Sequence, residues 1–217
     1  FATSHPRYFT ERLIDACADL AKVCEHFHIP FQSGDDAVLK AMARGYTVDR
    51  YRRIIDRIRQ RMPDAAISAD VIVAFPGETD AHWQSVLDFM DEVRFDHVGI
   101  FTYFPEDGTP AATLGGTVPD RVKKRRQRAA MARQQEFSAT RTATIVGTTI
   151  DVLVEGVAED DTRASGIGGT GARLVGRTYR DAPEVDGFTV FEGAARRGEI
   201  RDAQDNLLAV LREAFPA

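Results

Sequence analysis

One short stretch, residues 70–79, constrains the fold of this chain more than any other. Its apolar run at 71–75 ends at Pro76 and Gly77, and an amphipathic run follows Glu78 and Thr79. This pattern predicts a buried strand, a tight turn and the start of a helix. The turn follows the carboxyl end of the strand, where α/β proteins bind their ligands. Gly77 lets a ligand approach the backbone closely, and Pro76 stiffens the turn.

Further strands are predicted at residues 26–31 and 97–103, with helices between them. The alternation of strand and helix predicts right-handed βαβ units and a parallel sheet, and therefore an α/β fold. A parallel sheet this small, with apolar residues on both faces, is not complete. We therefore expect the second half of a barrel. The predicted helices cover residues 10–20, 35–44, 47–62, 80–93 and 118–144.

After residue 146 the pattern changes to that of a small all-β module. Residues 149–155 alternate strictly between polar and apolar, as do residues 189–191. The glycine-rich segment 165–171 has no lysine of a phosphate-binding loop, and we interpret it as a hairpin connection. The expected domains are a partial barrel (1–118), a linker helix (119–145) and a β module with an unassigned tail (146–217).

The helix at 118–144 allows two interpretations. It either contacts RNA through its basic residues, or it is a solvated linker with Met131 and Phe137 as its buried points. The second is favoured, because acidic and basic residues balance over residues 1–145. The basic residues in question are Lys123, Lys124, Arg125, Arg126, Arg128 and Arg133.

Charge and cysteine content restrict the cellular setting. Residues 146–217 carry 13 acidic residues and 8 arginines, which argues against binding of this module to a phosphate backbone. The two cysteines, Cys17 and Cys24, make no disulfide framework, so we expect a reducing cytoplasm. No membrane-spanning run or signal peptide is evident. The sequence opens at Phe1 in mid-element, so we expect it to be a piece of a longer protein.

Polar residues follow each predicted strand, and convergent polar groups at strand ends build the pockets of barrel enzymes. They indicate a pocket but no particular reaction. Separately, Cys24, His26 and His28 share one face of a strand. They either hold zinc, for which a fourth ligand is missing, or line the barrel; the second is favoured. The strand-end residues are Gln32 and Ser33, Glu78 and Thr79, and Tyr103 and Glu106.

Longer segments resemble the radical-SAM methylthiotransferases of the MiaB/RimO type. Residues 1–80 resemble most the tRNA-modifying MiaB branch, and residues 95–200 the RimO branch, which modifies an aspartate of a small-subunit ribosomal protein. The segments that carry the resemblance include Ser-His-Pro-Arg-Tyr at 4–8, Pro-Phe-Gln-Ser-Gly-Asp at 30–35, Phe-Pro-Gly-Glu-Thr at 75–79, Glu-Asp-Gly-Thr-Pro-Ala at 106–111 and Gly-Arg-Thr-Tyr-Arg-Asp-Ala-Pro-Glu-Val-Asp-Gly at 176–187.

The resemblance implies the carboxyl half of a radical-SAM barrel followed by a TRAM module. It also implies S-adenosylmethionine and [4Fe-4S] clusters, with a deoxyadenosyl radical that abstracts hydrogen before sulfur is inserted and methylated. The cluster cysteines of such enzymes are absent here, because Cys17 and Cys24 are seven residues apart. Alone, the chain is expected to bind no cluster or other metal and to contribute no catalytic residue. The cluster-bearing amino-terminal domains would be its missing partners.

The resemblance assigns a cofactor site to the later strands. Two departures from the family pattern concern this site: Ala74 replaces a usual glycine, which crowds the pocket by one methyl group, and Phe104 replaces a usual serine. The acidic module favours a basic ribosomal protein over tRNA as substrate. A non-catalytic RNA- or ribosome-binding module is a further alternative. The implied adenosylmethionine-binding residues are Gln32, Ser33, Arg44 (on a helix), Phe75, Gly77 and Glu78, and the implied substrate-binding residues are Tyr103 and Glu106.

Overall fold

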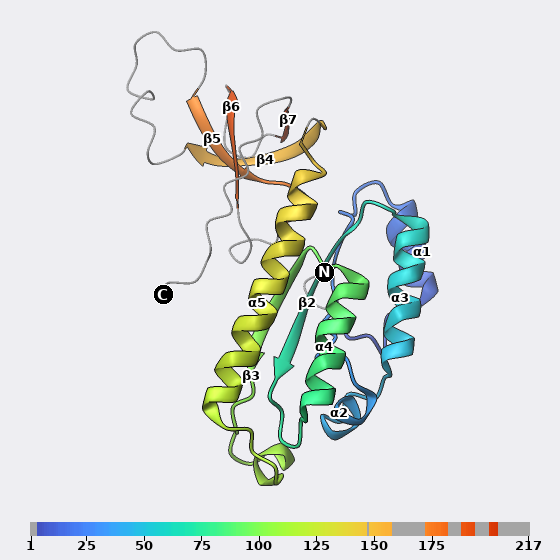
Figure 1. Ribbon diagram of the computed structural model, residues 1–217. Helices are drawn as coiled ribbons and strands as arrows, with labels where there is room; N and C mark the ends of the chain where they lie inside the picture. Colours follow the sequence, from blue (N-terminus) through green and yellow to red (C-terminus); the bar gives the residue numbers. More distant parts are fainter. Residues whose placement is uncertain (1–3, 147, 158–171, 182–187, 194–199, 204–217) are drawn as a thin grey trace. The chain divides into compact units, whose positions relative to one another are not determined.

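The computed structural model describes residues 4–146, 148–157, 172–181, 188–193 and 200–203. The chain forms two compact units, Phe1–Ala139 and Thr140–Ala217. Figure 1 shows the elements of each unit. The domain bounds expected from the sequence stay a prediction.

The first unit contains a parallel sheet in the order β1-β2-β3, which confirms the predicted topology. Its strands are β1 (His26–His28), β2 (Ala66–Val73) and β3 (His97–Thr102). The central strand β2 begins earlier than the predicted residue 71 and ends before Phe75. Residues after β1 continue the pairing only through an isolated bridge between Gln32 and Val71.

The helices of this unit begin where the sequence predicts. Thr10, Asp35, Thr47 and Thr79 each cap the following helix through a side-chain oxygen that accepts a backbone N–H. Figure 1 shows α3 and α4 running alongside β2. The helices are α1 (Glu11–Asp19), α2 (Asp36–Ala41), α3 (Val48–Arg61), α4 (Asp80–Val93), the short 3₁₀ helix η1 (Pro110–Thr113) and α5 (Asp120–Ala143).

The two faces of the sheet differ in chemistry. Alternate residues of β2 belong to the apolar core, and Phe27 and Ile100 of the neighbouring strands join them. An aromatic group from the loops and helices completes this core: Phe31 stacks on Phe95 at 5.2 Å between ring centroids. The opposite face carries a polar row from β1 and β2. The core residues of β2 are Ile67, Ala69, Val71 and Val73, and the polar row consists of His26, His28, Ser68 and Asp70.

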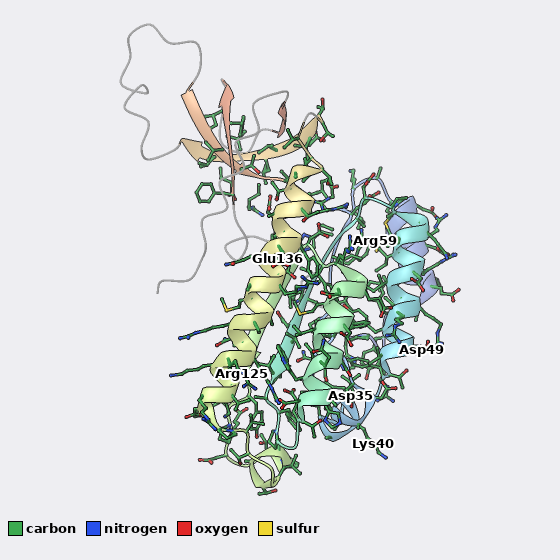
Figure 2. All side chains as sticks on the ribbon, viewed as in Figure 1. Asp35, Lys40, Asp49, Arg59, Arg125 and Glu136 are labelled. Atoms are coloured by element: carbon green, nitrogen blue, oxygen red, sulfur yellow. The ribbon has the colours of Figure 1, made fainter. Side chains whose placement is uncertain are left out.

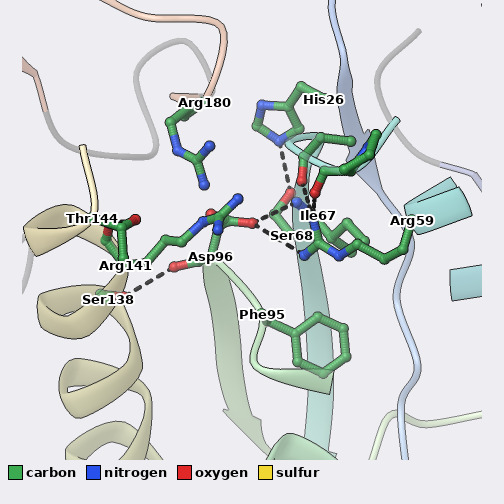
Figure 3. Close-up of polar contacts among 12 residues, drawn as sticks. His26, Arg59, Ile67, Ser68, Phe95, Asp96, Ser138, Arg141, Thr144 and Arg180 are labelled. Atoms are coloured by element: carbon green, nitrogen blue, oxygen red, sulfur yellow. Dashed lines mark hydrogen bonds and ion pairs between the residues drawn. The ribbon is translucent and has the colours of Figure 1, made fainter. Parts of the chain in front are cut away.

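A buried carboxylate fixes the amino-terminal end of the sheet. Asp96 is 4% exposed, and its Oδ2 accepts the Ile67 N–H at 2.8 Å (Figure 3). Its backbone carbonyl accepts the Ser138 hydroxyl at 2.9 Å, and Arg59 lies 3.9 Å from its carboxylate. Asp96 thus ties the start of β2 to the segment before β3 and to α5.

Helix α5 packs on the first unit with a partly polar face. Its buried residues are Arg126, Ala130 and Gln134, which lie one turn apart. The solvated-linker interpretation is therefore wrong for this face, although Met131 and Phe137 pack against the core as it expected. Lys124, Arg125 and Arg128 are exposed, and the position of Arg125 is labelled in Figure 2. Whether these three residues contact RNA stays a prediction.

The second unit is an antiparallel sheet in the order β6-β5-β4-β7. Its strands are β4 (Ile150–Val157), β5 (Ala172–Arg177), β6 (Thr189–Gly193) and β7 (Ile200–Ala203). The all-β prediction for this region is confirmed, although the sequence missed β5 and β7. The predicted hairpin connection at 165–171 and the tail after residue 203 lie outside the described residues. The apolar cluster of this sheet contains Ile150, Val152, Val154, Leu174 and Phe191.

Within the described residues, none of the helices has the length and apolar content needed to span a bilayer.

The end of α2 differs from its prediction. The helix ends at Ala41, and Ala43 adopts a left-handed φ of 55°. The Arg44 N–H then bonds to the Leu39 carbonyl at 3.0 Å, which closes the last turn. The family-based placement of Arg44 on a helix is therefore wrong, because the left-handed residue turns the chain away before it.

Replacing Ala43 with glycine is expected to stabilise the chain. A left-handed backbone strains alanine but not glycine, so the free energy of unfolding should rise by about 0.5–1 kcal/mol. Ala129→Gly is the matched control, because Ala129 is also exposed but lies inside α5. It should lower the free energy of unfolding by about 1 kcal/mol. Urea unfolding measures the free energy of unfolding of both variants. If both substitutions changed it in the same direction, the end of α2 at Ala41 would be contradicted.

Candidate functional site

The loop between β2 and α4, residues 74–80, forms a closed turn at the carboxyl end of the sheet. The Glu78 N–H bonds to the Phe75 carbonyl at 2.9 Å, with Pro76 and Gly77 at the central positions. Gly77 has a φ of +83°, as the third residue of a type II turn requires. A Cβ at Gly77 would have no atom within 4 Å. The Cα of Gly77 therefore faces open space, while its N–H donates to the Gly116 carbonyl at 2.9 Å.

Glu78 closes this loop from the inside. Its side chain is fully buried, and its Oε1 accepts the Ala74 N–H at 2.9 Å. The same oxygen receives Nη1 of Arg126 from α5 at 2.7 Å. Burial raises the pKa of Glu78, while the Ala74 N–H and the Arg126 guanidinium oppose this shift. The other carboxylate oxygen, Oε2, is buried without a partner among the described residues.

Ala74 occupies the position where the family usually has glycine. Its φ is 62°, in the left-handed region that favours glycine. The left-handed backbone at this position explains why the family usually has glycine here. This reason is separate from the extra methyl group of alanine expected from the sequence. This left-handed residue directly follows the last residue of β2, Val73.

Phe75 and Tyr103 come together at the ends of β2 and β3. Their rings meet edge to face, with 5.1 Å between centroids. The Tyr103 hydroxyl is buried without a partner among the described residues. Lys123 of α5 donates to the Tyr103 carbonyl at 3.1 Å, which fixes the chain where it leaves β3.

Gln32 and Ser33 follow β1 at the same edge of the sheet. Gln32 has a φ of 62°, and its backbone bonds to Asp70 and Ile72 of β2. Its side-chain Oε1 is buried without a partner in the described part of the chain. Ser33 is 1% exposed, and its hydroxyl accepts the Asp35 N–H at 3.3 Å. Ser33 therefore shapes the turn before α2.

The structure brings Arg44 and Glu106 into no contact with this group. Arg44 lies near His5 and Tyr46, and its Nε is buried without a partner among the described residues. Whether Arg44 binds the cofactor stays a prediction. Glu106 is exposed in the loop after β3, and its backbone carbonyl accepts the Thr109 hydroxyl at 2.7 Å.

The polar row on the open face of the sheet forms a hydrogen-bonded chain. Ser68 Oγ lies 2.9 Å from His26 Nε2 and 3.0 Å from His28 Nδ1, and His28 Nε2 lies 3.2 Å from Asp70. His26 and His28 thus belong to one hydrogen-bonded row on this face, and whether this face lines a barrel stays a prediction. Cys24 is exposed and precedes β1. In the described residues, no group of three or more metal-ligating side chains occurs.

Comparison with known families gives two matches. Residues 1–90 match the family described as the radical SAM superfamily, and residues 146–204 match the TRAM domain. A radical SAM domain followed by a TRAM domain is the MiaB/RimO-type architecture. This chain fits that type. The resemblance found in the sequence is thereby confirmed at this level, without a choice between the two branches.

A solved structure supports the fold. The chain is similar to coproporphyrinogen III oxidase (HemN) from Escherichia coli, described as a radical SAM enzyme, with a TM-score of 0.54. The sequence identity is 12%, and the match covers 88% of this chain and 46% of the HemN chain. This likeness supports the radical-SAM α/β fold and leaves the reaction open. The chain spans less than half of the solved protein that it matches.

The radical SAM match implies S-adenosylmethionine and a [4Fe-4S] cluster. The strand ends fit the adenosine part of the cofactor. Gly77 faces open space, the partly exposed Tyr103 ring lies against the buried Phe75, and among the described residues Gln32 has a buried acceptor without a donor. The cluster does not fit, because the sequence holds only two cysteines and these lack the required spacing.

The sequence missed one residue that shapes this site. Arg126 was grouped with the exposed basic residues of its helix, yet its side chain is 3% exposed. A clue was available: Arg126, Ala130 and Gln134 recur at a spacing of four residues, which places them on one helix face. The polar character of two of them masked this face.

The environment of Arg44 predicts a pH effect. Burial, together with the guanidinium groups of Arg44 and Arg7, lowers the pKa of His5. In Arg44→Gln, this pKa should therefore rise toward its usual value, whereas the exposed control Arg12→Gln should leave it unchanged. Because the folded-state pKa of His5 is lowered, its contribution to stability is lost as the pH falls through the folded value. NMR titration of His5 measures the shift; an unchanged pKa in Arg44→Gln would contradict this arrangement.

Proposed function

We propose that the chain is the carboxyl-terminal portion of a radical-SAM methylthiotransferase, which inserts a methylthio group into an unactivated C–H bond. The observation that carries this proposal is the order of the two family matches, radical SAM and then TRAM, in one chain. When bound, S-adenosylmethionine supplies the radical chemistry, together with a cluster whose ligands lie outside this sequence.

In this proposal, the residues of the chain bind and orient the cofactor. Phe75 and the backbone at Gly77 would hold the adenosine. Gln32 supplies a hydrogen-bond acceptor, while Ser33 and Glu78 hold the turns on either side. Tyr103 and Glu106 belong to the substrate side, where Glu106 is exposed in the loop after β3.

The favoured substrate is an aspartate of a small-subunit ribosomal protein. The support is electrostatic: residues 146–217 have 13 acidic residues against 8 arginines. A module of this charge attracts a basic ribosomal protein and repels a phosphate backbone. The alternative is a tRNA adenosine, which the MiaB-like segments at 1–80 favour.

A sedimentation experiment distinguishes the two substrates. At one moderate ionic strength, the chain should sediment with small ribosomal subunits and should bind total tRNA only weakly. Both samples are compared at the same salt concentration, because salt screens either electrostatic contact. Binding to tRNA that weakens steeply with salt would favour the tRNA branch instead. The complete protein should leave a methylthio group on a ribosomal protein, detected by mass spectrometry. Modified adenosine in tRNA would overturn this substrate choice, and no methylthio group on either would favour a non-catalytic binding module.

The cofactor site predicts that Gly77→Val weakens binding of S-adenosylhomocysteine by about tenfold or more, because the side chain fills the space next to the turn. Gly108→Val is the matched control, since Gly108 has a φ of +81° and also no atom within 4 Å of a Cβ. Both variants strain the backbone alike, but Gly108 lies outside the proposed adenosine site. Isothermal titration calorimetry measures both, and equal affinities would place the ligand elsewhere.

A further inference from the structure

Arg126 is a buried residue of α5, and its hydrogen bonds go to the loop 74–80. Its Nη1 donates to Glu78 Oε1 at 2.7 Å and to the Glu78 carbonyl at 3.3 Å. Its Nη2 donates to Asp80 Oδ1 at 2.8 Å. Glu78 and Asp80 are the end of the turn and the first residue of α4. The guanidinium fork therefore bridges the loop to the start of the next helix.

The contact reaches the turn itself through Glu78. Oε1 of Glu78 receives both Arg126 and the Ala74 N–H, so one oxygen joins α5 to the first residue of the turn. Ala74 has a strained left-handed backbone, which persists only where its surroundings hold it. Arg126 thus acts on the same few residues that expose Gly77.

The burial of Arg126 is costly in itself. Its side chain is 3% exposed, that of Glu78 is fully buried, and Arg126 Nε has no partner among the described residues. A buried ion pair of this kind contributes little net stability compared with apolar packing, whereas it specifies one geometry. Neighbouring residues of α5 act in the same region: Lys123 and Gln127 donate to the carbonyls of Tyr103 and Ile100, along and after β3.

We propose that Arg126 is a positioning residue of the adenosylmethionine site, which fixes the loop 74–80 in the conformation that receives the adenosine. This inference rests on the proposed function. Arg126 itself does not touch the cofactor, because its bonds lead to Glu78 and Asp80. The helix that continues into the second unit thereby sets the shape of the cofactor loop.

The test compares arginine-to-lysine changes at two positions of α5. Lysine keeps the charge at 126 but loses the fork, so it cannot hold Glu78 and Asp80 together. Arg126→Lys should weaken S-adenosylhomocysteine binding by about tenfold and speed hydrogen exchange of the Ala74 amide. The matched control is Arg133→Lys, because Arg133 forms the equivalent fork with Asp91 at the other end of α4. It should change neither quantity.

A second variant removes both buried charges. In Glu78→Gln/Arg126→Met, the amide oxygen of the glutamine can still accept the Ala74 N–H, so the fold should persist without the hold from α5. This double variant should melt near the temperature of the original chain, but it should bind S-adenosylhomocysteine more weakly than the original chain does. Thermal unfolding and calorimetry on the same samples separate stability from affinity.

The outcomes are distinct. If the original chain binds S-adenosylhomocysteine and Arg126→Lys binds it equally well at a lowered melting temperature, Arg126 is merely structural and the inference is overturned. If the original chain shows no binding while Ala74 exchange still depends on Arg126, the proposed cofactor site fails and the inference falls with it. If Arg126→Lys binds S-adenosylhomocysteine weakly while Arg133→Lys binds it as well as the original chain does, the inference is supported.

Discussion

Strand β2 hydrogen-bonds to a parallel neighbour on each edge, and the register of both neighbours is fixed by it. The carboxyl ends of all three strands therefore meet at one edge of the sheet. Gln32, Phe75 and Tyr103 come from distant parts of the chain, yet each lies just beyond its strand. The candidate site exists because this pairing aligns the strand ends, and its chemistry comes from the loops that follow them.

The ends of β2 are held by buried carboxylates that accept backbone N–H groups. At the amino-terminal end, Asp96 accepts from Ile67, and beyond the carboxyl end Glu78 accepts from Ala74. A backbone N–H left unpaired in the interior would cost about 1–3 kcal/mol, so each carboxylate stabilises the start or end of the strand. Each also has an arginine within ion-pair distance, Arg59 and Arg126. The loop 74–80 is thus held by the same kind of contact that holds the start of β2.

The two faces of β2 explain how one small sheet combines a core with a polar lining. The face of Ile67, Val71 and Val73 packs against apolar side chains. The expectation of apolar residues on both faces of the sheet is wrong for the opposite face. The other face presents Ser68 and Asp70, which bond to the histidines of β1. The sequence left two interpretations for those histidines, and their bonds to Ser68 place both in one hydrogen-bonded row.

The sequence by itself determined the order of strands and helices, the helix caps and the β character of the second unit, because these depend on residues close along the chain. It also placed Gly77 and Phe75 at a strand end. Only the tertiary structure decided that Arg126 is buried against Glu78, since these residues are far apart in sequence and their pairing follows from how α5 packs on the loop. The tertiary structure also decided that Arg44 lies beyond the end of α2. The helix ends before a left-handed residue, and because this residue is Ala43 and not glycine, the sequence did not predict the end there. Local patterns fix local conformation, whereas a buried charge depends on whichever partner the fold brings to it.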